Sequence, residues 1–225
     1  MNPLDPAGIF ISFEGGDGVG KSTQSRLLGE WLREVTGRVV VWTREPGGTD
    51  LGRVLRQEVL HGDDMDPRTE ALLYAADRAH HVATVVRPAL ERGDVVITDR
   101  YLDSSVAYQA GGRSLAADEV ERLSLWAVED LLPHLTILLD LDPTVGAARL
   151  TDAPDRLERA GDEFHLRTRQ AFLDRSAQDP ARWLVLDASG TQEDIHDAIR
   201  AAVVTRLGDA LGVADGASLG EREVG

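Results

Sequence analysis

The sequence of 225 residues contains no cysteine, a single lysine and few aromatic residues. Without cysteine, the chain can form neither disulfides nor thiolate metal sites. It also lacks an apolar run of about 18 residues, the length that predicts a membrane-spanning helix. The start, Met1 to Gly8, has neither the basic nor the apolar region of a signal peptide. We therefore expect a cytoplasmic protein that does not interact with a membrane.

Basic residues are in the minority, with 24 Lys and Arg against 39 Asp and Glu and a net charge of −15. Such a charge argues against nucleic-acid binding, which needs a broad basic surface, and any anion site must be a local basic focus. All but one of the basic residues are arginine, and the exception is Lys21. A GC-rich coding bias explains most of this skew. It does not explain why the one lysine falls in a glycine-rich turn, where a compact ammonium fits between phosphate oxygens better than a guanidinium.

Short apolar runs alternate with stretches of helical periodicity along the chain. This order predicts βαβ units and an α/β fold, a five-stranded parallel sheet flanked by helices. We expect one domain over residues 1–207, a charged lid at about 150–162, and a disordered tail over 208–225 that is rich in Gly, Ala and Glu. The predicted strands cover residues 9–14, 39–42, 94–98, 135–141 and 183–187. The predicted helices cover residues 21–36, 51–60, 69–90, 117–131, 144–150, 163–178 and 191–207.

A phosphate-binding motif follows the first predicted strand and opens the first predicted helix. It is the Walker A pattern, whose backbone N–H groups surround a phosphate at a helix N-terminus. Lys21 would span the β- and γ-phosphates of ATP, and the Ser22 hydroxyl would hold Mg²⁺. The predicted ATP-binding residues are Gly15, Gly16, Asp17, Gly18, Val19, Gly20, Lys21, Ser22 and Thr23.

Two further segments are expected at the same edge of the sheet, because ligands bind beyond the carboxyl ends of parallel strands. The turn 44–49 follows the second strand and contains a Glu45-Pro46 bond that either isomer would fit. Asp99 and Arg100 follow the third strand. Asp99 occupies a Walker B-like position, so it would bind Mg²⁺ together with Ser22.

Several blocks of sequence resemble those of the thymidylate kinases. They run in the order of that family and cover about residues 9–207. The blocks are Phe13 to Thr23, Arg44-Glu45-Pro46-Gly47-Gly48-Thr49, Tyr74-Ala75-Ala76-Asp77-Arg78, Asp99-Arg100-Tyr101, Ser104 to Gln109 and Asp155-Arg156-Leu157-Glu158. The resemblance implies a P-loop nucleoside monophosphate kinase-like fold with a short lid. It also implies phosphoryl transfer from ATP-Mg to dTMP, giving dTDP and ADP for dTTP synthesis, by a homodimer built on helix packing.

The resemblance also implies how dTMP would bind. Arg56 and Arg100 would clamp its 5′-phosphate, since the arginine fork suits bidentate phosphate contacts. Tyr74 would stack on thymine and Arg78 would donate to a base carbonyl. The remaining polar edge of the base would be read by Ser105 and Gln109, and the ring of Tyr108 would crowd C2′ and favour deoxyribose. Taken alone, Tyr74 also fits a core aromatic residue, and Arg56 also fits a solvated charge.

Phosphoryl transfer needs a cation that neutralises the moving group. The variable P-loop positions carry no arginine, and in this respect the chain resembles family members, mostly bacterial, with the catalytic arginine in the lid. We favour Arg156 for that role and place Arg149 over the adenine. Asp17 is also a candidate catalytic residue, but not a general base, because a phosphate with a second pKa of about 6 is already mostly deprotonated. It would orient the sugar 3′-hydroxyl or a metal-bound water. The histidines are assigned no catalytic role.

Three alternatives remain open at this stage. A kinase for another base would need other partners than Tyr74, Arg78, Ser105 and Gln109. A nucleotide-dependent switch would leave a second basic cluster, Arg56, Arg78 and Arg100, without a purpose. A degenerate homologue is disfavoured because no expected catalytic position is missing. The sequence does not fix the donor nucleotide or the rejection of dUMP, since one methyl in an apolar pocket is worth only about 1–3 kcal/mol.

Overall fold

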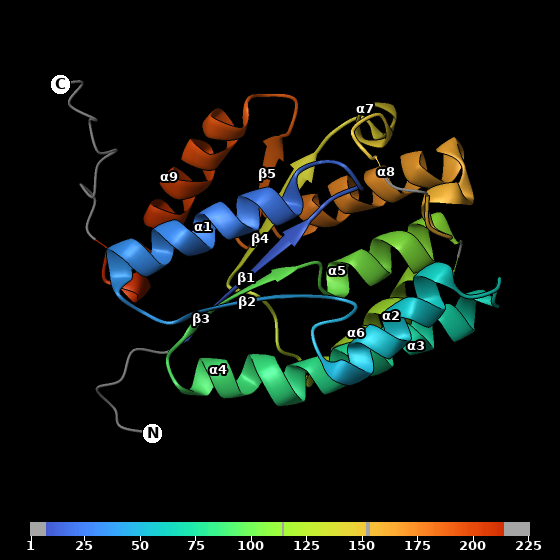
Figure 1. Ribbon diagram of the computed structural model, residues 1–225, viewed down its shortest axis with the longest axis horizontal. Helices are drawn as coiled ribbons and strands as arrows, with labels where there is room; N and C mark the ends of the chain where they lie inside the picture. Colours follow the sequence, from blue (N-terminus) through green and yellow to red (C-terminus); the bar gives the residue numbers. More distant parts are fainter. Residues whose placement is uncertain (1–7, 114, 152–153, 214–225) are drawn as a thin grey trace.

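The computed structural model describes residues 8–113, 115–151 and 154–213, and within them strands and helices alternate (Figure 1). The strands are β1 (Ile9–Glu14), β2 (Val40–Arg44), β3 (Val95–Asp99), β4 (Leu135–Asp140) and β5 (Trp183–Asp187). The α-helices are α1 (Lys21–Thr36), α2 (Asp50–His61), α3 (Pro67–His81), α4 (Arg87–Glu91), α5 (Leu102–Ser105), α6 (Ala117–Val128), α7 (Pro143–Ala147), α8 (Asp162–Gln178) and α9 (Gln192–Leu211). Two π-helical segments, η1 (Val82–Val86) and η2 (Val106–Gly112), and the 3₁₀ turn η3 (Glu158–Ala160) complete them.

The strands form one parallel sheet in the order β2-β3-β1-β4-β5, which confirms the predicted five-stranded parallel sheet. The register aligns Phe13 of β1 and Arg44 of β2 with Asp99 of β3. The carboxyl ends of these three strands therefore lie at one edge. The glycine-rich turn, the turn after β2 and Arg100 all begin there, as the sequence predicted.

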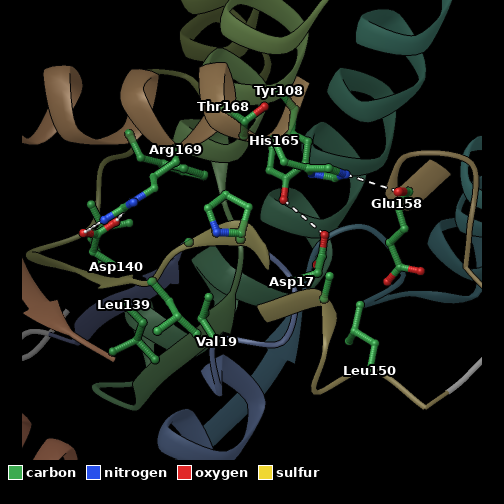
Figure 2. Close-up of a pocket in the computed structure, with 17 residues that line it drawn as sticks. Asp17, Val19, Tyr108, Leu139, Asp140, Leu150, Glu158, His165, Thr168 and Arg169 are labelled. Atoms are coloured by element: carbon green, nitrogen blue, oxygen red, sulfur yellow. Dashed lines mark hydrogen bonds and ion pairs between the residues drawn. The ribbon is translucent and has the colours of Figure 1, made fainter. Parts of the chain in front are cut away.

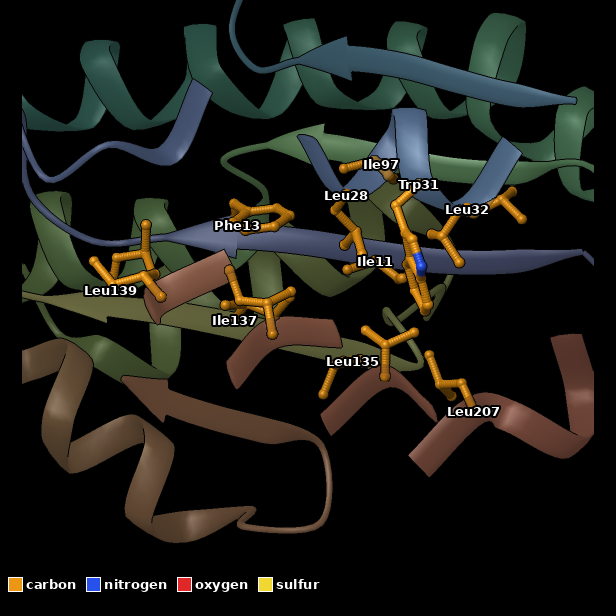
Figure 3. Packing of buried hydrophobic residues seen from close by; sticks show 14 of the residues in the cluster. Ile11, Phe13, Leu28, Trp31, Leu32, Ile97, Leu135, Ile137, Leu139 and Leu207 are labelled. Carbon is orange, nitrogen blue, oxygen red and sulfur yellow. The ribbon is translucent and has the colours of Figure 1, made fainter. Parts of the chain in front are cut away.

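The central strands are buried on both faces, which explains their continuous apolar runs. Side chains of β1 alternate between two clusters. Ile11 and Phe13 pack against α1 and α9, as Figure 3 shows. Phe10 packs on the other face with Val82 and Val86. Helix α1 presents Leu28, Trp31 and Leu32 to the sheet at the spacing of one helical face. The sheet is thus held between two layers of helices (Figure 1).

Element boundaries differ from prediction where tertiary contacts override the local pattern. The helix predicted over 69–90 is divided into α3, η1 and α4, with Pro88 in the first turn of α4, where its missing N–H is tolerated. Helix α5 and η2 were not predicted, because they are short and end at two glycines. The predicted helix 144–150 ends at Ala147, and 117–131 ends at Val128. The strand predicted over 39–42 extends to Arg44, which pairs with Asp99.

The tail predicted from residue 208 begins too early. Helix α9 continues to Leu211 and ends at Gly212, whose φ of 71° lies in the left-handed region. Leu211 and Val213 are buried in the main core, so this turn of helix is held by packing. Residues 214–225 lie outside the described part of the chain. None of the helices described is both long and apolar enough to span a membrane.

Candidate nucleotide site

The glycine-rich turn between β1 and α1 has a backbone that only glycine fits at two positions. Gly15 has a φ of 130° and Gly18 a φ of 73°. A Cβ atom at Gly15 would lie 2.5 Å from the Leu139 carbonyl oxygen, and one at Gly18 would lie 2.1 Å from that of Gly146. The turn therefore passes in direct contact with the end of β4 and with α7. No described side chain caps the first N–H groups of α1, so they are available to bind an anion.

Lys21 lies inside this turn. It is buried, and its Nζ donates to the carbonyl oxygens of Gly15, at 3.2 Å, and Gly16. Beside it the Ser22 hydroxyl donates to Asp99 Oδ2 at 2.6 Å. A hydroxyl and a carboxylate are oxygen ligands of the kind that Mg²⁺ prefers, and Mg²⁺ usually takes only one or two ligands from the protein. The described residues contain no group of three or more His, Cys, Asp or Glu side chains that could hold a metal ion.

Lys21 and Ser22 line an open cleft, here called the P-loop cleft. Its polar wall is completed from the ends of the neighbouring strands and from the lid. It is lined by Asp17, Gly18, Gly20, Lys21, Ser22, Thr23, Arg44, Glu45, Arg56, Asp99, Arg100, Arg149, Leu150 and Glu158.

Arg100 lines the P-loop cleft and also a second cleft, which is described below. Its backbone has a φ of 70°, a conformation that costs a non-glycine residue about 1–3 kcal/mol. Its guanidinium donates to the Gly15 carbonyl at 3.0 Å and to Asp17 Oδ1 at 2.6 Å. The turn that holds it is fixed by buried Glu14, which accepts from Tyr101 N at 2.8 Å and from the Ser104 hydroxyl at 2.5 Å. Burial, aided by a nearby carboxylate, raises the pKa of Glu14 to about 8.

Asp17 is ionised by its surroundings. Burial alone would raise its pKa, but the charges of Arg100 and Lys21, with hydrogen bonds from Arg100 and Tyr108, outweigh it and lower the pKa to about 2. A carboxylate with so low a pKa is a poor general base at neutral pH. The orienting role expected for Asp17 stays a prediction.

A second cleft opens beside α3 and is called the α3 cleft. It contains every side chain that the sequence assigned to the acceptor nucleotide. It is lined by Asp17, Glu45, Pro46, Arg56, Leu60, Tyr74, Arg78, Arg100, Tyr101, Ser104, Ser105, Tyr108, Gln109, Asp155 and Leu157. Tyr74 and Arg78 lie one turn apart on α3 and so face the same way.

Arg78 is almost fully buried and only partly paired. Its Nε donates to Glu45 Oε2 at 2.7 Å and its Nη2 to the Tyr101 carbonyl at 3.3 Å. Among the described residues, its Nη1 and the Ser105 hydroxyl have no hydrogen-bond partner. An unpaired buried polar group costs about 1–3 kcal/mol, so both atoms indicate a polar ligand. Behind Arg78, His81 bridges Glu45 and Thr43 at 2.7 Å each, which holds Glu45 in place.

Tyr108 and Gln109 reach the α3 cleft from η2. The Tyr108 ring packs edge-on against Phe164 and Phe172 of α8. Its hydroxyl accepts from Arg100 at 3.0 Å and donates to Asp17 at 3.3 Å. The Gln109 amide donates to Glu70 at 2.9 Å.

A further cavity lies behind the P-loop, between β4, α7 and α8 (Figure 2). Asp17 and Tyr108 line it as well as the α3 cleft, so their hydrogen bond forms part of the wall between the two. On the far side Arg169 pairs with Asp140 at 2.7 Å. His165 Nε2 donates to the Glu158 carbonyl at 3.2 Å.

Arg149, just before the lid, and Arg156, within it, occupy different places. Arg149 lines the P-loop cleft and donates to the Ala188 carbonyl at 3.4 Å. Arg156 does not line that cleft. It is buried, its Nη1 lies 2.6 Å from Glu70 Oε2, and its Nε and Nη2 donate to the Val59 carbonyl. To neutralise a moving phosphoryl group, as the sequence predicts, Arg156 must leave these partners.

Sequence reasoning missed the buried polar residues that support the site, among them Glu14, Glu70 and His81. Glu70 accepts from Gln109, a predicted site residue. Glu14 accepts from the backbone of Tyr101, which follows Arg100, and His81 contacts Glu45, the partner of Arg78. One signal was available for Glu70, because it lies one helical turn before Tyr74 on the predicted helix. Nothing in the local pattern distinguishes His81 from the neighbouring His80.

Comparison with known proteins agrees with this geometry. A sequence model of the family described as "Thymidylate kinase" matches residues 13–199. The chain is 62% identical over 209 residues to "Thymidylate kinase" of Leifsonia xyli subsp. xyli, covering 91% of this chain and 99% of that one. It is 56% identical over 214 residues to "Thymidylate kinase" of Bifidobacterium longum subsp. infantis, covering 93% and 91% respectively. Among solved structures, the thymidylate kinase of Ehrlichia chaffeensis superposes with a TM-score of 0.74 at 32% identity, over 88% of this chain and 99% of that chain. The chain belongs to the thymidylate kinase family.

Proposed function

We propose that this protein transfers the γ-phosphoryl group of ATP to thymidine 5′-monophosphate, giving dTDP and ADP for the synthesis of dTTP. One observation carries the proposal. The P-loop cleft and the α3 cleft share Asp17, Glu45, Arg56 and Arg100 as lining residues. Two phosphates bound in these clefts would meet between the two arginines, which is the arrangement that in-line transfer requires.

The chemistry of the α3 cleft supports thymine as the base. Arg78 offers an unpaired donor at Nη1 to a base carbonyl, and Ser105 offers an unpaired hydroxyl. Tyr74 supplies a flat apolar face on which a base can stack. The ring of Tyr108, held between Phe164 and Phe172, is stiff enough to crowd a ribose 2′-hydroxyl.

Catalysis would come from positioning and charge neutralisation. Lys21 would leave the loop carbonyls and bind the β- and γ-phosphates of ATP. Arg56 and Arg100 would hold the acceptor phosphate, and Asp17 would orient the sugar 3′-hydroxyl or a metal-bound water. Ser22 and Asp99 would hold Mg²⁺, which supplies positive charge to the phosphates when bound. Arg149 would cover the adenine and Arg156 would act from the lid.

We propose that the protein forms a homodimer. Large apolar side chains are exposed along neighbouring helices α2, α3 and α6, namely Leu51, Val54, Leu72 and Trp126, and Trp126 is 79% exposed. An apolar group of this kind is typical of a protein interface. We expect sedimentation to give twice the chain mass, and Trp126→Glu to shift the protein toward the monomer. We also propose a cytoplasmic location, because the anionic substrates do not cross membranes unaided.

The test is ADP production from ATP-Mg²⁺ by the purified protein with dTMP, dUMP, dCMP, dGMP, AMP or thymidine as acceptor. Turnover dominated by dTMP, with weaker dUMP and none with thymidine, supports the proposal. Preference for another acceptor would overturn the assignment of the base. ATP binding without acceptor-dependent turnover would favour a nucleotide-dependent switch.

A further inference from the structure

Glu70 is a buried carboxylate that lines neither the α3 cleft nor the P-loop cleft. It lies in the first turn of α3, one turn before Tyr74, and its side chain is 0% exposed. A buried charge is costly unless it is paired. Among the described residues, three side chains pair with it: Gln109, Arg113 and Arg156. Of these, Gln109 lines the α3 cleft and Arg156 belongs to the lid.

Contact with Glu70 fixes the polarity of the Gln109 amide. Gln109 Nε2 donates to Glu70 Oε1 at 2.9 Å. A carboxylate paired with two guanidiniums can only accept, so the amide nitrogen must face it and the amide oxygen must turn away. Gln109 therefore offers an acceptor to a ligand in the α3 cleft, whereas Arg78 Nη1 offers a donor. Thymine presents N3–H and C4=O, which complement this pair, while cytosine presents a lone pair and an amino group, which oppose it.

The same carboxylate holds the lid. Glu70 Oε2 lies 2.6 Å from Arg156 Nη1, and the Arg156 backbone N–H donates to the Leu60 carbonyl at 2.9 Å. The residues on either side of Arg156, Asp155 and Leu157, line the α3 cleft. Because both oxygens of Glu70 are engaged, the orientation of the base-reading amide and the seating of the lid depend on one group.

We propose that Glu70 is a specificity-determining positioning residue, which turns the Gln109 oxygen toward the base and seats the lid on the same cleft through Arg156. The inference rests on the proposed function, since it assumes a pyrimidine monophosphate in the α3 cleft. Without the carboxylate, the Gln109 amide is free to turn over and present its nitrogen to the base. A lone pair at N3 is then accepted, and discrimination against cytosine falls.

The test is Glu70→Gln in the full-length protein, a substitution that keeps the shape and removes the charge. Steady-state rates with dTMP, and the Ki of dCMP against dTMP, are measured at saturating ATP. We expect the preference for dTMP over dCMP to fall roughly tenfold, the effect of one misdirected hydrogen bond. The KM for dTMP should rise, and the KM for ATP should stay within about twofold.

Two further variants separate the two roles of Glu70. Arg113→Gln is the matched control, because Arg113 contacts the same carboxylate at 3.3 Å but does not line the α3 cleft. It should leave the dTMP preference within about twofold of wild type. Arg156→Gln removes the lid contact and also the proposed catalytic arginine, so it should lower kcat and raise the KM for dTMP, but leave the preference for dTMP over dCMP unchanged.

An unchanged dTMP preference in Glu70→Gln overturns the proposal, even if the KM for dTMP rises, because Glu70 would then act on the lid alone. If Glu70→Gln does not fold by circular dichroism, Glu70→Asp replaces it. This variant keeps the charge and withdraws it from Gln109, so it should lose part of the preference, and an unchanged preference is again contrary. Wild-type protein without dTMP-dependent ADP formation would instead refute the proposed function.

Discussion

The two clefts that meet at Arg100 are built in different ways. In the P-loop cleft, six of the fourteen lining residues come from one stretch between Asp17 and Thr23, where glycines fix the backbone geometry. The α3 cleft gathers side chains from α2, α3, α5, η2 and the lid. A site made from one turn is specified by local sequence, whereas a site made from distant side chains depends on buried partners that hold each of them.

The largest effect is expected at Lys21, the single lysine of the chain. Lys21→Met should lower kcat about 10²–10³-fold, the loss typical for one group that stabilises a transition-state charge. Lys21→Arg keeps the charge and is the control. If the compact ammonium matters, Lys21→Arg should be nearly as impaired. Stopped-flow or coupled assays of ADP release measure both variants. Wild-type rates in Lys21→Arg would show that catalysis requires only a positive charge at this position.

A substitution of Arg100 tests which of the two clefts this shared residue serves. Arg100→Met removes contacts to Asp17, Gly15 and Tyr108. We expect kcat/KM for dTMP to fall about 10–100-fold, since hydrogen bonds to charged groups are worth about 1.5–3 kcal/mol. ATP affinity, measured by calorimetry, should change only a few-fold. An equal loss of ATP and dTMP binding would mean that Arg100 serves the P-loop rather than the acceptor.

Sequence alone predicted the parts of the molecule that depend on local pattern. It located all five strands and ended α1 at the correct residues, because buried parallel strands and an amphipathic helix leave clear periodicities. It did not predict α5 and η2, which are stabilised by packing against α6 and α8 rather than by propensity. The seven acceptor residues came from resemblance, and the structure brings them into one cleft. The buried partners Glu14, Glu70 and His81 were not predicted. Their roles depend on residues distant in the sequence, and the hydrophobic periodicity of the sequence does not indicate such contacts.

Tyr108 separates hydrogen bonding from shape within the α3 cleft. Tyr108→Phe removes the hydroxyl that joins Arg100 and Asp17 but keeps the ring. It should lower kcat/KM for dTMP only roughly 2–10-fold, because Arg100 and Asp17 keep their direct hydrogen bond to each other. Tyr108→Ala also removes the ring and should, in addition, relax rejection of the ribonucleotide. Competing dTMP against its ribose analogue measures this. A relaxed preference already in Tyr108→Phe would assign the discrimination to the hydroxyl.

The smallest effect is expected at Asp77, which lies behind the α3 cleft and concerns stability rather than turnover. Burial, together with the charge of Glu45, raises the pKa of Asp77 from 3.8 to about 6. The folded protein thus holds this proton more tightly than the unfolded chain, so the stabilisation is present below about pH 4 and is lost as pH rises to about 6. Asp77→Asn cannot titrate, and its Oδ1 can still accept from Gly47 N, which lies 3.3 Å from Asp77 Oδ1 in the wild-type protein.

Relative to wild type, Asp77→Asn should therefore gain up to about 3 kcal/mol in free energy of unfolding between pH 4 and pH 7. Urea unfolding at several pH values measures the difference, with Asp63→Asn on the exposed loop after α2 as the control. A gain in the free energy of unfolding would show that the ionised Asp77, behind the α3 cleft, destabilises the folded protein and is tolerated by the surrounding fold. A difference that stays constant with pH would show instead that the pKa of Asp77 is not raised in the folded protein.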